Sequence, residues 1–381
     1  MPKKGIITDK HLHIVSLNVP YPPDYGGVID IFYKIKALQG NGIKVHLHCF
    51  EYGRSVAGEL EEICEEVSYY KRKKGFIYQL SPSPYIVLTR SDEKLLQNLS
   101  KDDYPILFEG IHTTRYITHP SIREKKKYIR THNIEHEYYR LLSQSEKILY
   151  KKFFLRMEAG KLRRFEKYLA LGDGIFAISK NDFTHFNDLF GKTYFLPPFH
   201  PFTNVLSKPG NSDYILFHGD LTVSDNRNAL ITLIRHVFSK LNLKVKIAGK
   251  TKDDRLRNFI STQRNFELIE NPDDEEMSQL IMNAQVIMLY TFQSTGMKLK
   301  LLSSLYQGRH CLVNPKMVEN TGLSELCHIA GNFSEAREKV QELMQTEFDM
   351  QSVNERKKIL NNQFCNMKNA ERLTKFIFHT P

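Results

Sequence analysis

The sequence has few of the features that are typical of secreted proteins, of proteins with structural metal sites, or of membrane-spanning proteins. Its five cysteines are scattered and odd in number, and no two form a CxxC pair. This argues against a disulfide framework or a zinc site and favours a reducing compartment. No window approaches about 20 uncharged apolar residues, and the N-terminus has no apolar core of signal-peptide length. We therefore expect a cytoplasmic protein.

Positive charge, in contrast, is abundant. The 381 residues carry a formal net charge of +11, with an ordinary hydrophobic content of 41%. Such an excess predicts contact with nucleic acid, a lipid surface or a phosphorylated ligand. The charge gathers in three runs, at residues 71–74, 123–127 and 147–167. Any one run is typical of a solvated face, and the length allows two or three domains.

The first half of the chain alternates strand and helix patterns. A first buried strand, predicted at 13–18, leads through a proline-rich loop to Gly26 and Gly27, then to apolar residues at helical spacing and a second strand at 44–50. This βαβ pattern predicts a parallel sheet. The glycine pair lets a ligand approach the backbone where the helix begins. It is not GxGxxG, so no dinucleotide site is predicted.

Polar residues cluster after two further predicted strands, at 105–109 and 127–131. In open α/β sheets, ligands bind outside the carboxyl ends of the strands. Each of these residues alone is typical of a loop or a cap, but the set favours a functional site. Its members are Glu109, His112, His132, Asn133, Glu135 and His136.

A long helical pattern at 145–171 mixes basic and apolar residues. Leu149, Phe153, Met157, Phe165 and Leu169 recur at a spacing that predicts a face packed on the core, with the basic residues solvated. A helix lying on a membrane surface is the alternative. Prolines at 197, 198 and 201 then predict a stiff linker and a domain boundary near residue 200.

A second α/β series follows, with predicted strands at 214–218, 244–248, 266–269, 284–290 and 310–314. Residues 293–308 form a small-residue turn and a helix after the fourth of these strands. A turn that opens a helix presents free N–H groups to a phosphate, and Lys298 and Lys300 add charge. The fold class is therefore α/β, with doubly wound domains at 1–200 and 201–360 facing across a cleft. A last helix at 361–381 is expected to pack back on the first domain.

Four segments carry a resemblance to a known family. They are PYPPDYGGVIDIFYKIKALQGNGIKVHLHCF, RTHNIEHEYY, FHGDLTVSDNRNAL and STGMKLKLLSSLYQGRHCLVN, the last followed by ENTGL. In this order they resemble the GT-B-fold retaining glycosyltransferases, the large nucleotide-sugar-dependent family of bacterial mannosyl- and glucosyltransferases. The likeness covers most of the chain. It implies two Rossmann-like domains, the first on the acceptor side and the second binding the donor nucleotide.

The resemblance also implies an activity and residue roles. A hexosyl group would pass from a nucleoside diphosphate sugar to a glycan or lipid-linked acceptor in cell-surface polysaccharide assembly. His132, with Glu135 or Glu109, would position or deprotonate the acceptor hydroxyl, although in a retaining enzyme the donor phosphate can be the base. Gly26, Gly27, His112 and Asn133 would contact the acceptor or the sugar. The donor would be held by Gly219, Lys250, Thr295, Gly296, Lys298, Lys300 and Ser303.

The sequence departs from this family at one point. Members of that family usually have two glutamates with seven residues between them, and these fall here on or near Thr295 and on Ser303. Asp220 stands where many relatives have arginine. A non-catalytic glycan- or nucleotide-binding protein is therefore the alternative.

Nucleic-acid binding ranks below both hypotheses, because no RNA-recognition or helix-turn-helix signature is present. The basic surface suits peripheral contact with an anionic membrane.

No Asp-x-Asp motif ends a strand, and Asp253-Asp254 and Asp273-Asp274 are interpreted as solvated loop residues. Backbone amides and lysines can neutralise a leaving diphosphate. We expect transfer without a metal or other cofactor.

Overall fold

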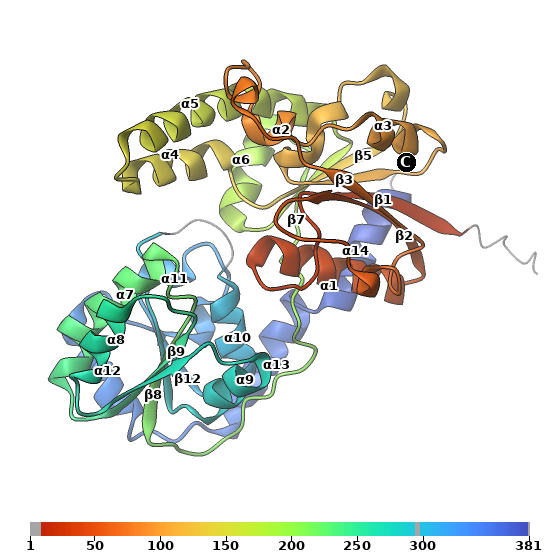
Figure 1. Ribbon diagram of the computed structural model, residues 1–381. Coiled ribbons are helices and arrows are strands. Elements are labelled where there is room, and N and C mark those ends of the chain that lie inside the picture. Colours follow the sequence, from red (N-terminus) through yellow and green to blue (C-terminus); the bar gives the residue numbers. More distant parts are fainter. Residues whose placement is uncertain (1–8, 294–297, 380–381) are drawn as a thin grey trace, which may run out of the picture. The chain divides into compact units, whose positions relative to one another are not determined.

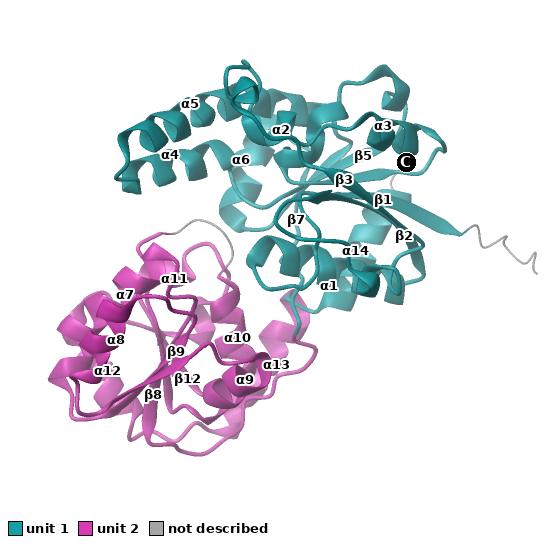
Figure 2. Ribbon diagram, in the orientation of Figure 1, with its two compact units in different colours: residues 1–201, 364–381 teal, residues 202–363 magenta. Residues whose placement is uncertain are grey.

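The computed structural model describes residues 9–293 and 298–379. The chain forms two compact units, one of residues 1–201 with 364–381 and one of residues 202–363 (Figure 2). Each unit is built on a sheet whose neighbouring strands all run parallel, with helices packed against it (Figure 1). The predicted α/β class with two Rossmann-like parallel sheets is confirmed.

The seven-stranded sheet of unit 1 has the order β3-β2-β1-β4-β5-β6-β7. Its strands are β1 Lys10–Ser16, β2 Ile43–Glu51, β3 Glu66–Lys71, β4 Ile106–Glu109, β5 Lys127–Thr131, β6 Gly174–Ala177 and β7 Thr193–Phe195. Every residue of β4, β5 and β6 is buried, because helices cover both faces of the central strands. The strand β3 was not predicted. It lies at the sheet edge and ends at the first residue of the basic run 71–74.

The helices of unit 1 include one from the far end of the chain. They are α1 Gly26–Gly40, α2 Tyr85–Leu88, α3 Glu93–Ser100, α4 Glu135–Ser145, α5 Leu149–Phe165, α6 Lys180–Phe190 and α14 Asn366–His379. Ala370, Leu373 and Ile377 of α14 join the core formed by β1, β2 and α1. The Tyr128 hydroxyl donates to the Phe376 carbonyl over 3.3 Å, which attaches α14 to β5.

Unit 2 repeats the architecture with six strands in the order β10-β9-β8-β11-β12-β13. They are β8 Tyr214–His218, β9 Lys244–Gly249, β10 Phe266–Glu270, β11 Val286–Leu289, β12 His310–Val313 and β13 His328–Ile329. Its helices are α7 Ser224–His236, α8 Asp254–Ser261, α9 Asp274–Asn283, α10 Leu299–Gln307, α11 Pro315–Val318, α12 Phe333–Leu343 and α13 Met350–Gln363. The end of the chain therefore forms two helices, α13 in unit 2 and α14 in unit 1.

Short 3-10 helices connect these elements. They are η1 Gly58–Leu60, η2 Phe76–Gln79, η3 Ile111–Tyr116, η4 Pro120–Ile122, η5 Glu166–Leu171, η6 Phe238–Lys240 and η7 Ser324–Leu326. The acidic pairs interpreted as solvated loops belong instead to helix starts. Asp253 and Asp273 are the N-caps of α8 and α9, and each side chain accepts a hydrogen bond from a backbone N–H of the first turn.

The helical stretch predicted at 145–171 is α5 followed by η5, and its predicted packed face is partly wrong. Leu169 is buried, but Leu149, Phe153 and Met157 are 81%, 64% and 39% exposed. The buried residues of α5 begin only at Glu158, so its first half has no core beneath it and packs on α4. Among the described residues, no helix combines the length and apolar content needed to cross a membrane.

Candidate functional site

The backbone segments that follow β8 and β9 nearly touch. A Cβ atom added to Gly249 would lie 1.9 Å from the carbonyl oxygen of Gly219. The Gly219 N–H also donates to the Ala248 carbonyl over 3.0 Å. Only glycine fits such an approach, which brings the two backbone segments into contact at the carboxyl edge of the sheet. Gly219 and Lys250, which the sequence predicts as donor-binding residues, both belong to these segments. The Lys250 carbonyl accepts from Leu221 N–H over 2.9 Å.

Two lysines lie at the beginning of α10, beside this edge. Lys300 Nζ donates to Asn226 Oδ1 over 2.7 Å, and the Asn226 amide donates to the Asp220 carbonyl over 2.9 Å. Burial lowers the pKa of Lys300 to about 8, with Asp225 opposing the shift and Lys298 adding to it. Burial also lowers the pKa of Lys298. A bound anion would stabilise both ammonium groups, which is the property expected of a phosphate site.

The remaining predicted donor residues divide into two groups. Thr295 and Gly296 lie outside the described residues. Ser303 is half-buried on α10, and its hydroxyl accepts a hydrogen bond from Gln307 Nε2 over 3.0 Å. The next residue, Ser304, pairs with the buried His218 at 2.8 Å. The contact of Ser303 with a donor therefore stays a prediction.

Sequence reasoning missed Asp225 and Asn226 in the first turn of α7. Asp225 accepts hydrogen bonds from the Thr291 hydroxyl over 2.9 Å and from the Phe292 N–H over 3.4 Å, which ties α7 to the segment after β11. Asn226 is the partner of Lys300. The signal in the sequence is Asp225-Asn226 at the start of a helix that follows Gly219, because such residues bind neighbouring backbone and side-chain groups there.

Unit 1 contains a fully buried network of charged side chains at the corresponding sheet edge. Lys34 Nζ binds Asp30 over 2.9 Å and Glu109 over 2.7 Å, and Arg130 binds Asp30 over 2.9 Å. His132 Nε2 lies 3.0 Å from the other Glu109 oxygen. The sequence analysis brought forward Glu109 and His132 but missed the other three. Asp30 and Lys34 could have been found, because they fall on the apolar face of α1 beside Ile31 and Ile35.

This network gives Glu109 a positioning role. Burial opposes its ionisation, but the charge of Lys34 and the hydrogen bond to His132 outweigh it and lower the pKa of Glu109. A carboxylate held in this way orients the His132 ring and does not take up a proton near neutral pH. Gly26 and Gly27 open α1 one turn before Asp30, and the preceding Tyr25 makes no side-chain cap. The Tyr25 side chain therefore does not occupy the N–H groups of this first turn, which can meet a ligand.

A second polar group, formed by His112, Asn133 and Glu135, lies near this network. The Asn133 amide donates to Glu135 over 3.4 Å, and His112 Nε2 is 4.0 Å from the other Glu135 oxygen. Burial raises the pKa of Glu135 to about 7 and holds the pKa of His112 well below its usual value. His112 Nδ1 is buried and has no hydrogen-bond partner among the described residues. Groups perturbed and left incomplete in this way mark candidate ligand sites.

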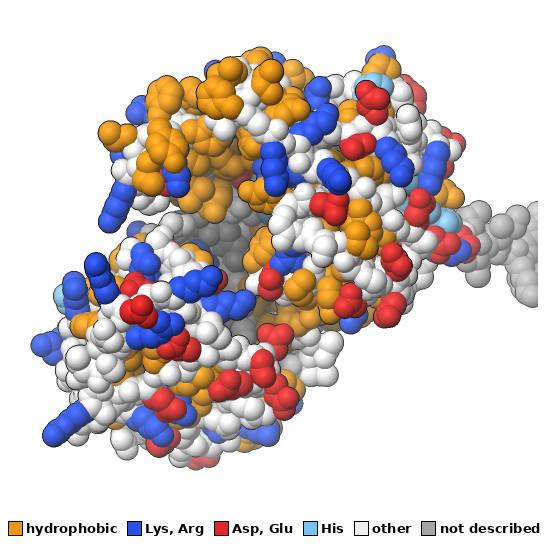
Figure 3. Space-filling model, viewed as in Figure 1, with side chains coloured by type: hydrophobic (Ala, Val, Ile, Leu, Met, Phe, Trp, Pro, Cys, Tyr) orange, Lys and Arg blue, Asp and Glu red, His pale blue; other side chains and the backbone are white. Residues whose placement is uncertain are grey.

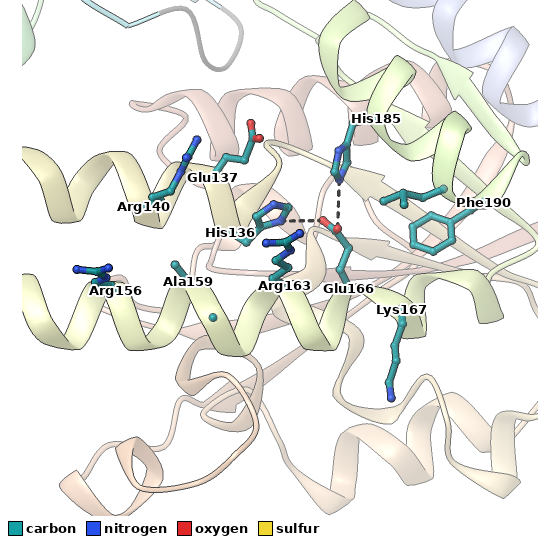
Figure 4. A pocket seen from close by; sticks show the side chains of 12 residues that line it. His136, Glu137, Arg140, Arg156, Ala159, Arg163, Glu166, Lys167, His185 and Phe190 are labelled. Atoms are coloured by element: carbon teal, nitrogen blue, oxygen red, sulfur yellow. Dashed lines mark hydrogen bonds and ion pairs between the residues drawn. The ribbon is translucent and has the colours of Figure 1, made fainter.

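Two clusters of described residues have the side-chain spacing of a metal site. In the first, Asp30, Glu109 and His132, the carboxylates are already bound by Lys34 and Arg130, so a cation would meet two positive charges. This cluster does not fit a metal. The second, His136, Glu166 and His185, lines a separate cavity of ≈ 660 Å³ between α4, α5 and α6 (Figure 4).

Comparison with known proteins finds a relative by sequence and many neighbours by structure. No protein-family profile matches the chain. An uncharacterized 44.6 kDa protein in the cps region of Klebsiella pneumoniae is 27% identical over 311 residues, which cover 77% of this chain and 79% of the relative.

The structural neighbours are more distant in sequence. Sucrose-phosphate synthase from Thermosynechococcus elongatus aligns over 97% of this chain and 99% of its own, at a TM-score of 0.67 and 12% identity. A glycosyltransferase from Rickettsia africae aligns over 98% and 100%, at 0.67 and 13%. An Anabaena protein solved in complex with UDP and glucose aligns over 97% and 100%, at 0.63 and 11%. At such identities the likeness establishes the fold, which is GT-B: two parallel-sheet Rossmann-like domains.

Proposed function

We propose that the protein is a glycosyltransferase that moves a hexosyl group from a nucleoside diphosphate sugar to a glycan or lipid-linked acceptor in cell-surface polysaccharide assembly. The observation that carries the proposal is the pair Lys298 and Lys300 at the start of α10, with Lys300 joined through Asn226 to the backbone that follows Gly219. The GT-B fold, a neighbour that binds UDP and glucose, and a relative from a cps region support it. We place the reaction in the cytoplasm, where the free cysteines stay reduced.

The leaving diphosphate is the group that unit 2 stabilises. Its charge develops as the bond to the anomeric carbon breaks in an oxocarbenium-like transition state. Lys300 and Lys298, together with Thr295 and Gly296 as the sequence predicts, bind the diphosphate and offset that charge without a metal. In unit 1, His132, held by Glu109, orients the acceptor hydroxyl. Glu135, with a pKa of about 7, exchanges a proton near neutral pH. Gly26, Gly27, His112 and Asn133 contact acceptor or sugar, and the donor phosphate serves as base in a retaining reaction.

A non-catalytic binding protein on the same scaffold is the second candidate. The observation that favours it is Ser303, a hydroxyl bonded to Gln307 at a position where the resembled family has a carboxylate. Such a protein would bind nucleoside diphosphates through Lys300 and leave the donor intact. The two candidates share the phosphate site and differ in turnover.

A thermal-shift screen against nucleoside diphosphates and their sugars tests the shared site. We expect at least one diphosphate to raise the melting temperature of the native protein but not that of Lys300→Met. Lys357→Met removes an exposed lysine of α13 and serves as the matched control. Release of nucleoside diphosphate from the stabilising sugar, unchanged by EDTA, would support metal-independent transfer. Binding without turnover on glycan or lipid-linked acceptors would support the second candidate, and absence of any stabilisation would refute both.

A further inference from the structure

The hairpin of α4 and α5 exposes apolar side chains in a stripe. Leu149, Phe153 and Met157 follow one another at intervals of four residues, so they lie on one side of α5. All three are exposed, and so are the adjacent Ile148 and Tyr150. Neighbouring exposed apolar groups of this size are unusual on a monomeric protein and mark an interaction surface.

A second apolar group lies beside this stripe. Phe76, Ile77 and Leu80, in and after η2, are each exposed by at least 69%. Lys161 Nζ of α5 donates to the Gln79 carbonyl over 2.6 Å, which places η2 against the helix. Hydrophobic side chains accordingly gather over α5 and over the segment that precedes α2 in the space-filling view (Figure 3). We call the two groups together the apolar face.

Most of the charges around the apolar face are positive. Lys147, Lys151 and Lys152 are exposed between its members, and Lys71, Lys73 and Lys74 directly precede η2. None of these six lysines forms an ion pair with a carboxylate in the part of the chain that the structure describes. A protein partner matched to this surface would need both apolar and acidic groups. An anionic bilayer offers both at its boundary, because acyl chains lie directly beneath phosphates.

The cavity behind the face continues the positive surface. Arg140, Arg156, Arg163 and Lys167 line it, and Arg156 is the direct neighbour of Met157. Figure 4 shows Glu166 joined to His136 and His185, whose ring nitrogens lie 3.3 and 3.1 Å from its two oxygens. Glu166 is thereby engaged, which leaves Glu137 as the other acid among the lining residues. Four cations around the histidines disfavour a metal ion and favour a phosphate, which arginine binds in bidentate fashion.

We propose that this surface of unit 1 docks on a bilayer that contains anionic phospholipid. The apolar face enters the boundary between head groups and acyl chains, and the surrounding lysines and the arginines of the cavity bind lipid phosphates. The basic runs alone are compatible with a solvated face. The exposed apolar side chains between them favour a lipid as the binding partner of this surface. The docking is independent of catalysis, since it requires only the described surface of unit 1.

The absence of tryptophan from the chain allows a direct test. A Phe153→Trp variant carries one reporter inside the apolar face, and a Met350→Trp variant carries one at an exposed position on α13. With vesicles of phosphatidylcholine and phosphatidylglycerol, we expect the Phe153→Trp emission to shift to the blue and to be quenched by brominated acyl chains. The Met350→Trp emission should not change. Unchanged emission from Phe153→Trp would overturn the proposal.

Charge is tested separately by vesicle flotation. The double variant Lys151→Gln, Lys152→Gln should bind phosphatidylglycerol vesicles about thirtyfold more weakly, because each surface cation contributes about fivefold. The control Lys357→Gln, Lys358→Gln removes the same charge from α13 and should bind as the native protein does. Equal loss in both would assign binding to net charge and overturn the proposal. A dimer in which Phe153→Trp is shielded without vesicles would assign the apolar face to a second copy of the chain.

Discussion

Lys34 Nζ lies 2.7 Å from Glu109 Oε1, and neither side chain is more than 1% exposed. The contact joins α1 to β4, and Arg130 on β5 completes the link through Asp30. The same Glu109 holds His132 through its second oxygen. The charges of such a buried network cannot rearrange without a large free-energy cost. The network therefore fixes the position of His132, the candidate acceptor-side histidine.

Lys34→Met should destabilise unit 1 strongly, because it leaves the buried Glu109 carboxylate without its cation. Breaking one partner of a buried pair costs about 3–5 kcal/mol. Urea denaturation measures the change. The control is Lys44→Met, since Lys44 pairs with Asp9 at the surface over 2.9 Å and such pairs contribute about 0–1 kcal/mol. Adding Glu109→Gln to Lys34→Met should recover part of the loss. Similar unfolding free energies for the two single variants would contradict the role given to Lys34.

Unit 1 should also lose stability in mild acid, through His13. Its ring is buried between Asp102, at 3.0 Å, and His48, at 2.9 Å, and burial lowers its pKa to about 4. The unfolded chain takes up this proton near pH 6.5, before the folded chain does. Stability therefore falls as the pH drops from about 6.5 to about 4, by on the order of 3 kcal/mol. Burial of His48 acts in the same direction.

Urea midpoints at pH 7.5, 6 and 5 measure this dependence. His13→Asn should give a shallower decline over the same range, because it removes the group that titrates differently in the two states. A native midpoint that does not move between pH 7.5 and 5 would show that His13 is not held neutral.

The strands that could be predicted from the sequence are those with both faces buried. Residues 214–217 and 286–290 are continuous apolar runs, so their strands could be located without a structure. The edge strand β3, with the sequence EVSYYK, is only partly buried and has no such run. For α5, the sequence pattern predicted the helix but not which of its sides is buried. Helical spacing grouped Leu149, Phe153 and Met157 on one side, but it could not show that no core lies beneath that side.

The candidate site divides in the same way. Gly219 and Lys300 could be selected from local sequence, because a glycine after a strand and a lysine at a helix start are local patterns. The contact between Asp30 and Arg130 joins residues 100 positions apart, and it depends on β1, β4 and β5 being neighbours. That order is a property of the assembled sheet. Sequence reasoning therefore found one end of the Lys34 network, His132 and Glu109, and missed the rest of it.

Gly249→Ala should damage the donor site. The added Cβ would collide with the Gly219 carbonyl, so one of the two backbone segments must move. We expect lower stability of unit 2 and weaker binding of nucleoside diphosphates, measured by urea denaturation and calorimetric titration. Gly160→Ala is the matched control, because nothing lies within 4 Å of its added Cβ in helix α5. Alanine there should stabilise by roughly 0.5–1 kcal/mol. Normal nucleotide affinity in Gly249→Ala would show that the close approach of Gly219 and Gly249 is not needed for donor binding.

Affinity for a nucleoside diphosphate should fall above about pH 8. Partial burial lowers the pKa of Lys300 to about 8, and a bound diphosphate favours its protonated form. Below that pH the lysine already carries its charge, so affinity changes little. Above it, binding must first take up a proton, and affinity falls by up to about tenfold per pH unit.

Calorimetric titrations in buffers of different ionisation enthalpy would detect that proton uptake at pH 9 and its near absence at pH 7. Lys300→Arg keeps a charge at both pH values and should bind with a flat pH profile, whereas Lys300→Met should bind weakly at both. Native affinity that is equal at pH 7 and pH 9, with no proton uptake, would exclude Lys300 as the residue that meets the diphosphate.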